Sequence, residues 1–250
     1  MGHVVFIGAG PGAADLITVR GAERLAQADV VLFDALTDPA LRDLAPRAKW
    51  VSVGKRGFAD STGQQTINAL LVRYARAVEV VVRLKGGDPS VFGRLEEELE
   101  ALAQAGIACE VVPGVTAAIA AAATTKRPLT RRGHGRSVSL ATAMTREGQV
   151  QATRSADTEV FYMAGKRLAA LSRRLLAAGW PEGTPVSVVS RAGWPDQLQS
   201  DHTVKALARA AVLHAGRPTV VVVGAGAVPL SCGTSKTTPT SSRRPARVKP

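Results

Sequence analysis

The chain has 250 residues, a length that fits one large α/β domain or two compact domains of about 120 residues each. Hydrophobic residues make up 46% and charged residues 21%, a composition that excludes a mostly disordered chain. No apolar run reaches the length of a membrane-spanning helix, and the N-terminus lacks the pattern of a secretory signal. Cys109 and Cys232 are too few and too distant for a disulfide framework or a zinc site. We therefore expect a cytoplasmic protein with neither a metal site nor a membrane contact.

The net charge of +12 favours an anionic partner. Five of these charges lie in residues 231–250, a segment rich in Ser, Thr and Pro that contains no acid, and without them the charge is +7. We expect this segment to be a disordered basic tail. Aromatic residues make up only 4% of the chain, and no motif places them among basic residues as RNA-binding modules do. Nucleic acid is therefore the less favoured partner.

The first half of the chain alternates between apolar strands and amphipathic helices. We expect strands at residues 3–9, 30–33, 50–53, 79–84 and 108–112. We expect helices at residues 15–28, 64–77 and 96–105, and an alanine-rich helix that ends near residue 123. This alternation is typical of a mostly parallel sheet covered by helices on both faces.

Residues 128–136 interrupt this rhythm, because Pro128, Gly133 and Gly135 lie there among basic side chains. Beyond them we expect strands at residues 137–142, 159–163, 185–189 and 219–223, and helices at residues 167–178 and 203–213. The sequence thus predicts the α/β class, with two α/β domains. Their expected bounds are residues 1–127 and 137–230, joined by a linker at 128–136 and followed by the tail at 231–250.

The first strand ends in a glycine-rich turn, residues 8–13 (GAGPGA), which resembles a dinucleotide-binding turn. Asp29 or Asp34 lies near the distance expected for a ribose-binding acid. Pro11 argues against this interpretation, because it removes an N–H group where a pyrophosphate needs donors. By itself the motif fits a ligand-binding turn and a purely structural strand-to-helix turn equally well.

The fourth strand ends in a second such loop, residues 84–94 (LKGGDPSVFGR). Paired glycines let a ligand approach the backbone closely, and Asp88 can accept hydrogen bonds from a ribose or an amino group. Parallel sheets bind ligands beyond the carboxyl ends of their strands. Because both loops lie at such ends, we expect them to line one pocket.

Several longer motifs occur in order: GAGPGAADL, VGKRG, VVRLKGGDPSVFGR, EVVPGVTAAIAAAA, RPLTRR and FYMAGK. Together they resemble the tetrapyrrole methyltransferases that use S-adenosylmethionine, over about residues 3–230. The resemblance implies two α/β domains with the cofactor in the cleft between them. It also implies a homodimer that methylates two ring carbons of an anionic tetrapyrrole, uroporphyrinogen III, giving precorrin-2 for sirohaem or cobalamin synthesis.

The resemblance assigns an acid–base pair to Asp34, in LFDAL, and Lys55, in VGKR. A carboxylate can take the proton that the ring must lose, and an ammonium group can donate a proton or stabilise negative charge. The cofactor contacts carried over are Pro11, Gly86, Gly87, Asp88, Val91, Thr116, Ala117, Met163 and Ala192. Without the resemblance, Asp34 would be a turn cap, Lys55 a solvated charge and Met163 a core residue.

Six basic residues are candidates for attracting the carboxylate arms of such a substrate: Arg56, Lys85, Arg94, Arg127, Arg131 and Arg132. The sequence departs from the family pattern at residues 56–63, which lack a usual histidine, and at Leu95-Glu96, where a glycine pair is usual. Ser190-Arg191 replaces a Glu-Asn stretch, next to the expected contact at Ala192.

Three other functions stay open. A precorrin methyltransferase that acts later on the corrin ring would have the same fold and cofactor. A dinucleotide-binding oxidoreductase would use residues 8–13. An RNA-binding or RNA-modifying protein is supported by the charge alone.

Overall fold

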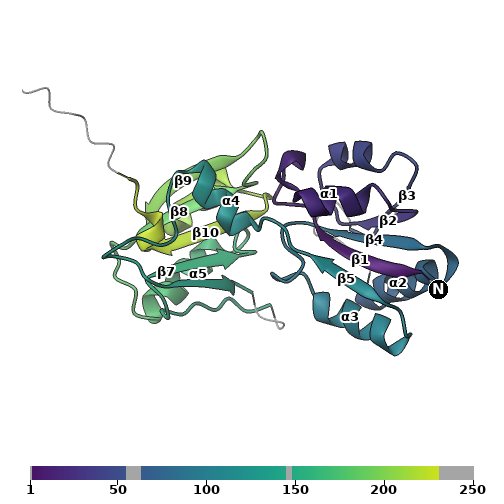
Figure 1. Cartoon of the computed structure of the whole chain (residues 1–250). Coiled ribbons are helices and arrows are strands. Elements are labelled where there is room, and N and C mark those ends of the chain that lie inside the picture. Colours follow the sequence, from purple (N-terminus) through teal and green to yellow (C-terminus); the bar gives the residue numbers. More distant parts are fainter. Residues whose placement is uncertain (1, 55–62, 145–147, 231–250) are drawn as a thin grey trace, which may run out of the picture.

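The computed structural model describes residues 2–54, 63–144 and 148–230 (Figure 1). They form two α/β domains that lie next to each other, each built on a five-stranded sheet. None of the helices in this part of the chain is both long and apolar enough to cross a membrane.

The first sheet is parallel throughout, with the strand order β3-β2-β4-β1-β5. Its strands are β1 (His3–Gly8), β2 (Val30–Phe33), β3 (Lys49–Ser52), β4 (Val80–Lys85) and β5 (Cys109–Val112). Buried side chains of α2 (Gln64–Ala77) and α3 (Leu95–Gln104) pack on one face. Those of α1 (Val19–Leu25) and the 3₁₀-helix η2 (Pro39–Leu44) pack on the other. The parallel sheet with helices on both faces is confirmed.

The first helix is shorter than the expected range of 15–28. A single 3₁₀ turn, η1 (Ala14–Leu16), comes first, and α1 begins only after Thr18. The Thr18 hydroxyl accepts a hydrogen bond from the Gly21 N–H at 3.1 Å, which caps the helix. Because Thr18 has extended backbone angles, the two helical segments cannot join.

The second sheet is mixed, with the order β6-β7-β10-β8-β9. Its strands are β6 (Val138–Thr142), β7 (Thr158–Tyr162), β8 (Pro185–Ser190), β9 (Leu198–Thr203) and β10 (Thr219–Gly224). Only β6 and β7 pair in parallel, whereas β10 is antiparallel to both of its neighbours and β9 is antiparallel to β8. The alternation of strands and helices therefore predicted the strand direction correctly for the first sheet alone.

The strand β9 was not expected, and the helix expected at 203–213 is wrong over its first half. An edge strand exposes many of its side chains, so the polar segment LQSDHT carries no apolar signal. The helical part is limited to η3 (Leu207–Arg209) and the short α6 (Ala210–Leu213).

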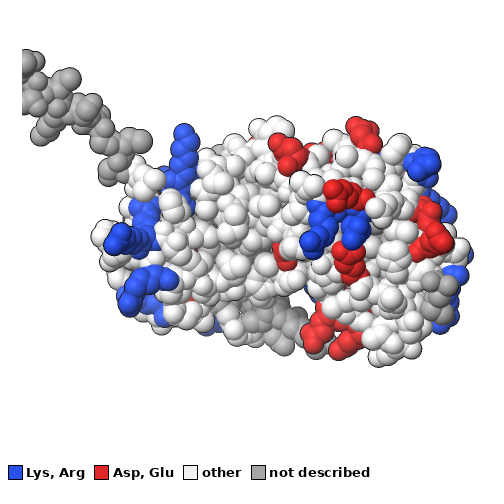
Figure 2. All heavy atoms as spheres, in the orientation of Figure 1, with Lys and Arg blue, Asp and Glu red and all other residues white. Residues whose placement is uncertain are grey.

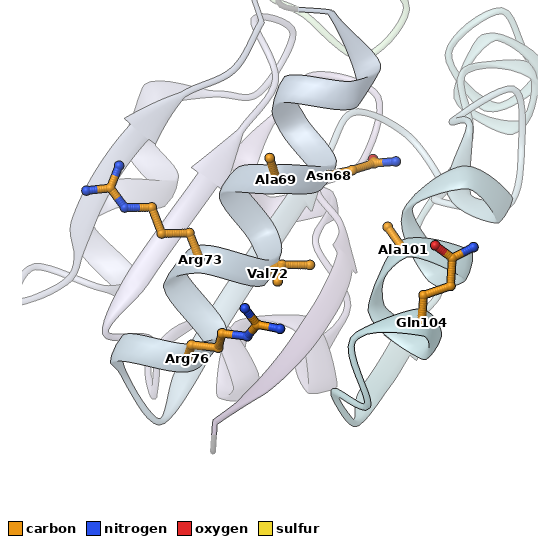
Figure 3. Close-up of a pocket in the computed structure, with 7 residues that line it drawn as sticks. All are labelled: Asn68, Ala69, Val72, Arg73, Arg76, Ala101 and Gln104. Atoms are coloured by element: carbon orange, nitrogen blue, oxygen red, sulfur yellow. The ribbon is translucent and has the colours of Figure 1, made fainter.

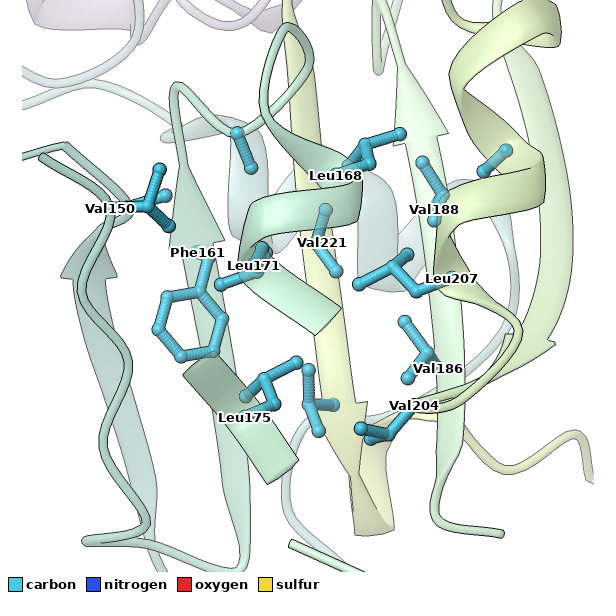
Figure 4. Close-up of a cluster of buried hydrophobic side chains, with 14 of the residues drawn as sticks. Val150, Phe161, Leu168, Leu171, Leu175, Val186, Val188, Val204, Leu207 and Val221 are labelled. Atoms are coloured by element: carbon cyan, nitrogen blue, oxygen red, sulfur yellow. The ribbon is translucent and has the colours of Figure 1, made fainter. Parts of the chain in front are cut away.

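The main core of the second domain lies between its sheet and α5 (Leu168–Ala177), as Figure 4 shows. Leu168, Leu171 and Leu175 recur at helical spacing, so all three point to the sheet. There they meet the inward side chains of Phe161 on β7 and Val188 on β8.

The alanine-rich helix α4 (Ala117–Thr124) covers the other face of this second sheet. Its buried Ala118 and Ala121 share a core with residues of β7, β8 and β10. Leu129 belongs to the same core, and its carbonyl accepts a hydrogen bond from the Thr158 hydroxyl at 2.8 Å. We therefore propose that the domain boundary lies at residues 113–116, before α4, and not at the expected position of 127.

Candidate functional site

The two glycine-rich loops meet at the carboxyl edge of the first sheet. Gly8 on β1 pairs in register with Lys85 on β4. Just beyond, the Gly87 N–H donates to the Gly10 carbonyl at 2.7 Å, and the Gly10 N–H donates to the Gly87 carbonyl at 3.3 Å. The two loops therefore meet at one edge of the sheet, and that they line one pocket stays a prediction.

Gly8 and Gly114 pack closely against backbone atoms at this edge, which leaves no room for side chains. A β-carbon on Gly8 would lie 2.5 Å from the Gly114 Cα, and one on Gly114 would lie 2.4 Å from the Gly87 carbonyl oxygen. At Gly87 itself a β-carbon would be 3.8 Å from the nearest atom, but its φ of +72° favours glycine. Backbone conformation, and not crowding by neighbours, therefore explains glycine at position 87.

Asp88 ties the loops after β4 and β5 together. One of its carboxylate oxygens accepts a hydrogen bond from the Gly114 N–H and the other from the Ser90 N–H, both at 2.8 Å. Each oxygen keeps a lone pair for a further donor. Asp88 thus shapes the loop edge and remains able to accept from a ligand.

The second domain closes the edge through Tyr162, at the end of β7. The Tyr162 hydroxyl lies 2.8 Å from the Thr116 hydroxyl and accepts from the Ala118 N–H at 3.3 Å. The Phe92 ring lies 5.0 Å from the Tyr162 ring, centre to centre. Desolvation raises the pKa of Tyr162, so the phenol is neutral at physiological pH. The contact at Thr116 brings Ala117 and Met163, the next residues along the chain, to the same place.

Strained backbone gathers at this junction. Five non-glycine residues of the described segments have positive φ, and four of them follow the ends of β4, β7 and β8: Phe92, Arg94, Met163 and Arg191. Residues other than glycine rarely adopt this backbone conformation, and it persists where a ligand or mechanism requires a particular loop shape. Met163 is 55% exposed, which is unusual for methionine in a core. Met163 is thus a surface residue next to Tyr162.

Asp34 lies at the same edge, directly after β2. One of its carboxylate oxygens accepts a hydrogen bond from Arg83 at 2.7 Å, and about a third of its side chain is exposed. A β-carbon on Gly86 would lie 3.4 Å from the Leu36 Cβ, so the loop after β2 adjoins the second glycine loop. Lys55, the other half of the expected pair, lies outside the described residues.

A contact across the two domains joins the first glycine loop to the loop after β8. The Trp194 indole N–H donates to the Pro11 carbonyl at 2.9 Å, and the Ala13 N–H donates to the Gly193 carbonyl at 2.9 Å. The Arg191 guanidinium stacks on the Trp194 ring, 4.2 Å from its centre. Sequence reasoning missed Trp194, although it follows the departure from the family pattern at Ser190-Arg191.

Ser190 and Ala192 are both buried. The Ser190 hydroxyl lies 2.9 Å from a ring nitrogen of the fully buried His214 and accepts from Arg217 at 3.0 Å. Desolvation lowers the pKa of His214, so its ring is neutral at neutral pH. The Ala192 side chain packs in the core beneath α4, which leaves its backbone as the part available to a ligand.

We expect Trp194→Phe to weaken binding of S-adenosylhomocysteine, the demethylated form of the cofactor that the resemblance implies, about fivefold, the equivalent of one lost hydrogen bond of about 1 kcal/mol. The reason is that Phe keeps the ring beside Gly12 but frees the Pro11 loop, which must then be ordered on binding. Titration calorimetry measures the affinity.

Trp180→Phe is the matched control, because it also removes an indole hydrogen bond to a backbone carbonyl, that of Thr153 at 2.7 Å. Its partner belongs to the second domain alone, so the affinity should stay unchanged. Equal losses in both variants would refute a specific role for the contact between Trp194 and Pro11.

A shallow groove of about 550 Å³ lies elsewhere, between α2 and α3 (Figure 3). Asn68 and Val72 reach into it from α2, and Ala101 and Gln104 line it from α3. None of its lining residues belongs to the loops after β1, β4 or β5, so it is separate from the candidate site. Within the described part of the chain, no three His, Cys, Asp or Glu side chains are placed to hold a metal ion.

Two of the six basic residues expected to attract an anionic substrate are buried in ion pairs. Lys85 and Arg127 are buried, paired with Glu98 at 2.7 Å and with Asp201 at 2.6 Å, so neither attracts a substrate from solution. On the face shown in Figure 2, acidic and basic side chains mix over the first domain, and the basic ones of the second domain lie at its outer end. Arg56 lies outside the described residues.

Comparisons with known proteins agree with this geometry. The family model of tetrapyrrole (corrin/porphyrin) methylases matches residues 3–208. The chain is 42% identical to the uroporphyrinogen-III C-methyltransferase of Pseudomonas aeruginosa, covering 89% of this chain and 93% of that one. It is 44% identical to siroheme synthase 2 of Yersinia pestis, covering 90% of this chain but only 48% of the longer relative.

Solved structures show the same relationship. Uroporphyrin-III C-methyltransferase of Thermus thermophilus, in complex with S-adenosylhomocysteine, matches with a TM-score of 0.78 at 35% identity and covers 89% of this chain and 97% of its own. A cobalt precorrin-4 methyltransferase matches with a TM-score of 0.79 at 31% identity, covering 91% of this chain and 96% of its own.

Proposed function

Because the chain belongs to the family of tetrapyrrole (corrin/porphyrin) methylases, we propose that it transfers methyl groups from S-adenosylmethionine to two ring carbons of uroporphyrinogen III, giving precorrin-2. One observation carries the proposal: the loops after β1, β4 and β5 converge with Asp34 at one edge, in a chain that resembles the Pseudomonas enzyme along nearly its whole length.

The residues at the edge fit the cofactor. Gly86 and Gly87 expose backbone without side chains, Asp88 keeps lone pairs for a donor, and Met163 offers an exposed apolar surface. We propose that these residues hold S-adenosylmethionine, together with the other expected contacts: Pro11, Val91, Thr116, Ala117 and the backbone of Ala192. When bound, the sulfonium group supplies an electrophilic methyl group.

We propose that Asp34 accepts the proton that the ring loses after a ring carbon is methylated. Its Oδ1 is taken by Arg83, whereas its Oδ2 has no hydrogen-bond partner among the described residues. A guanidinium bound to one carboxylate oxygen fixes the orientation of the group, and the other oxygen can still receive a proton. Lys55 remains the proposed partner that stabilises negative charge or donates a proton. Alignment of the two reactants supplies much of the remaining acceleration.

The dinucleotide-binding alternative finds no support in the first glycine loop. Gly10 and Ala13 donate their N–H groups to Gly87 and Gly193, and Pro11 has none. A pyrophosphate would therefore meet only one free N–H among these residues, that of Gly12, where such turns normally offer several.

A later precorrin methyltransferase is the closer alternative, because the cobalt precorrin-4 enzyme matches the fold equally well. The higher identity to the Pseudomonas enzyme favours uroporphyrinogen III. Since the chain spans about half the length of the siroheme synthases it matches, our proposal covers methylation alone. We also propose a homodimer in the cytoplasm, as the resemblance implies; light scattering tests the dimer.

Incubation of the purified chain with enzymatically made uroporphyrinogen III and methyl-labelled S-adenosylmethionine tests the proposal. We expect a product with two added methyl groups, followed by mass and absorption. Methylation of a later precorrin but not of uroporphyrinogen III would support the alternative. Binding of a nicotinamide cofactor without binding of S-adenosylmethionine would overturn both.

A further inference from the structure

A cluster of three buried charges lies directly beneath Asp34. Arg83 and Lys85 are two residues apart on β4, so both side chains point to the face of the sheet that α3 covers. Glu98 on α3 faces them, and its two carboxylate oxygens lie 3.0 Å from the Arg83 Nε and 2.7 Å from the Lys85 Nζ. The side chains of Arg83 and Lys85 are each 3% exposed, and that of Glu98 is 0% exposed.

Burial opposes the positive charges of Arg83 and Lys85, and the nearby carboxylates favour them. Desolvation acts to lower the pKa of Arg83, but the attraction of Asp34 and Glu98 outweighs it and raises the pKa overall. For Lys85, desolvation and the nearby Arg83 lower the pKa in spite of Glu98. The two carboxylates that Arg83 contacts therefore hold it as a cation.

The guanidinium of Arg83 is fixed from three sides. Its Nε donates to Glu98, its Nη1 donates to the Leu84 carbonyl at 3.2 Å, and its Nη2 donates to the Asp34 Oδ1 at 2.7 Å. Glu98 is itself held by Lys85 and by the Gln64 side-chain amide at 3.3 Å. Of the four charged groups, Asp34 has the most exposed side chain, at 32%, and it lies at the edge where the glycine loops meet.

We infer that Arg83, fixed by Glu98, is the positioning residue that orients the Asp34 carboxylate for proton transfer. This inference rests on the proposed role of Asp34. A planar guanidinium presents a rigid fork that can hold two carboxylates at once, which a lysine ammonium cannot do with the same geometry. Replacing a buried ion pair by apolar residues is often neutral for stability, so stability alone does not explain three buried charges here.

A double-mutant cycle tests the inference, with single-turnover formation of the deprotonated methylated product, followed by its absorption, as the readout. We expect Asp34→Asn to slow the reaction about 1,000-fold and Arg83→Gln about 100-fold. If Arg83 acts through Asp34, the double variant is no slower than Asp34→Asn alone, within about threefold. Binding of S-adenosylhomocysteine should stay within about threefold of wild type in all variants, because no cofactor contact changes.

Arg83→Lys keeps the charge and serves if Arg83→Gln does not fold. We expect it to slow turnover at least tenfold while the KM for the cofactor is unchanged, because a lysine cannot bridge Glu98 and Asp34. Arg73→Gln is the matched control, an exposed arginine on α2 that should react at the wild-type rate.

Multiplicative losses in the cycle, or a wild-type rate for Arg83→Lys, would overturn the inference. A wild-type chain that methylates no tetrapyrrole would instead contradict the proposed function itself, before any variant is compared. The two failures are therefore distinguishable.

Discussion

Asp34→Asn should lower the kcat for methylation of uroporphyrinogen III about 100- to 10,000-fold, the range typical of a lost general base. The amide is nearly the same size as the carboxylate but cannot accept a proton from the ring. Because Asp34 adjoins the glycine loop without belonging to the proposed cofactor contacts, the affinity for S-adenosylhomocysteine should be unchanged. Initial rates with labelled cofactor and calorimetric titration measure the two quantities.

Asp43→Asn provides the control, since Asp43 is an exposed aspartate in η2, the 3₁₀-helix that follows Asp34 in the chain. We expect it to behave as wild type in both assays. Loss of cofactor binding in Asp34→Asn, with the rate at saturation retained, would assign Asp34 to binding and remove it from the proton transfer.

Gly114→Ala should destabilise the protein by about 3 kcal/mol, the upper part of the usual range for overpacking. The added methyl group would lie 2.4 Å from the Gly87 carbonyl oxygen and 2.7 Å from the Gly8 Cα. Both neighbours are backbone atoms, one at the end of β1 and the other in the loop after β4. Neither can move without disrupting the backbone pairing at this edge of the sheet. We expect the melting temperature to fall by about 6–12 °C and the affinity for S-adenosylhomocysteine to fall at least tenfold.

Gly183→Ala is the control, because a β-carbon there would meet nothing within 4 Å. Its melting temperature and affinity should match those of wild type. If Gly114→Ala also matched wild type in scanning calorimetry and titration, the close packing of the three loops would be refuted.

The sequence predicted the first domain well because its three central strands, β1, β2 and β4, are buried on both faces. Such strands are mostly apolar, as β1 and β4 are, and the carboxyl ends of these two strands carry the recognisable glycine loops. The strand β9 gave no such signal, since its side chains alternate between exposed and partly buried positions at the edge of a sheet.

The sequence predicted the loops of the site but not the long-range contacts that hold those loops in place. Arg83 and Lys85 are two cations in an otherwise apolar strand, a signal that one buried face carries charge, but the sequence did not identify Glu98 as their partner. Trp194 and Pro11 are 183 positions apart, and no local pattern links residues at that distance. Long-range contacts of this kind depend on how two domains pack, which periodicity does not encode.

The position of β10 has a consequence for synthesis on the ribosome. This strand is fully buried in the middle of the second sheet, between β7 and β8, although it is the last strand to be made. The first domain can fold while the chain is still growing, but β7 and β8 present unpaired edges until residue 224 has emerged. Tyr162 and Trp194 therefore reach Phe92 and Pro11 of the first domain only at the end of translation, and a nascent chain stalled before β10 exposes two strand edges that are open to aggregation.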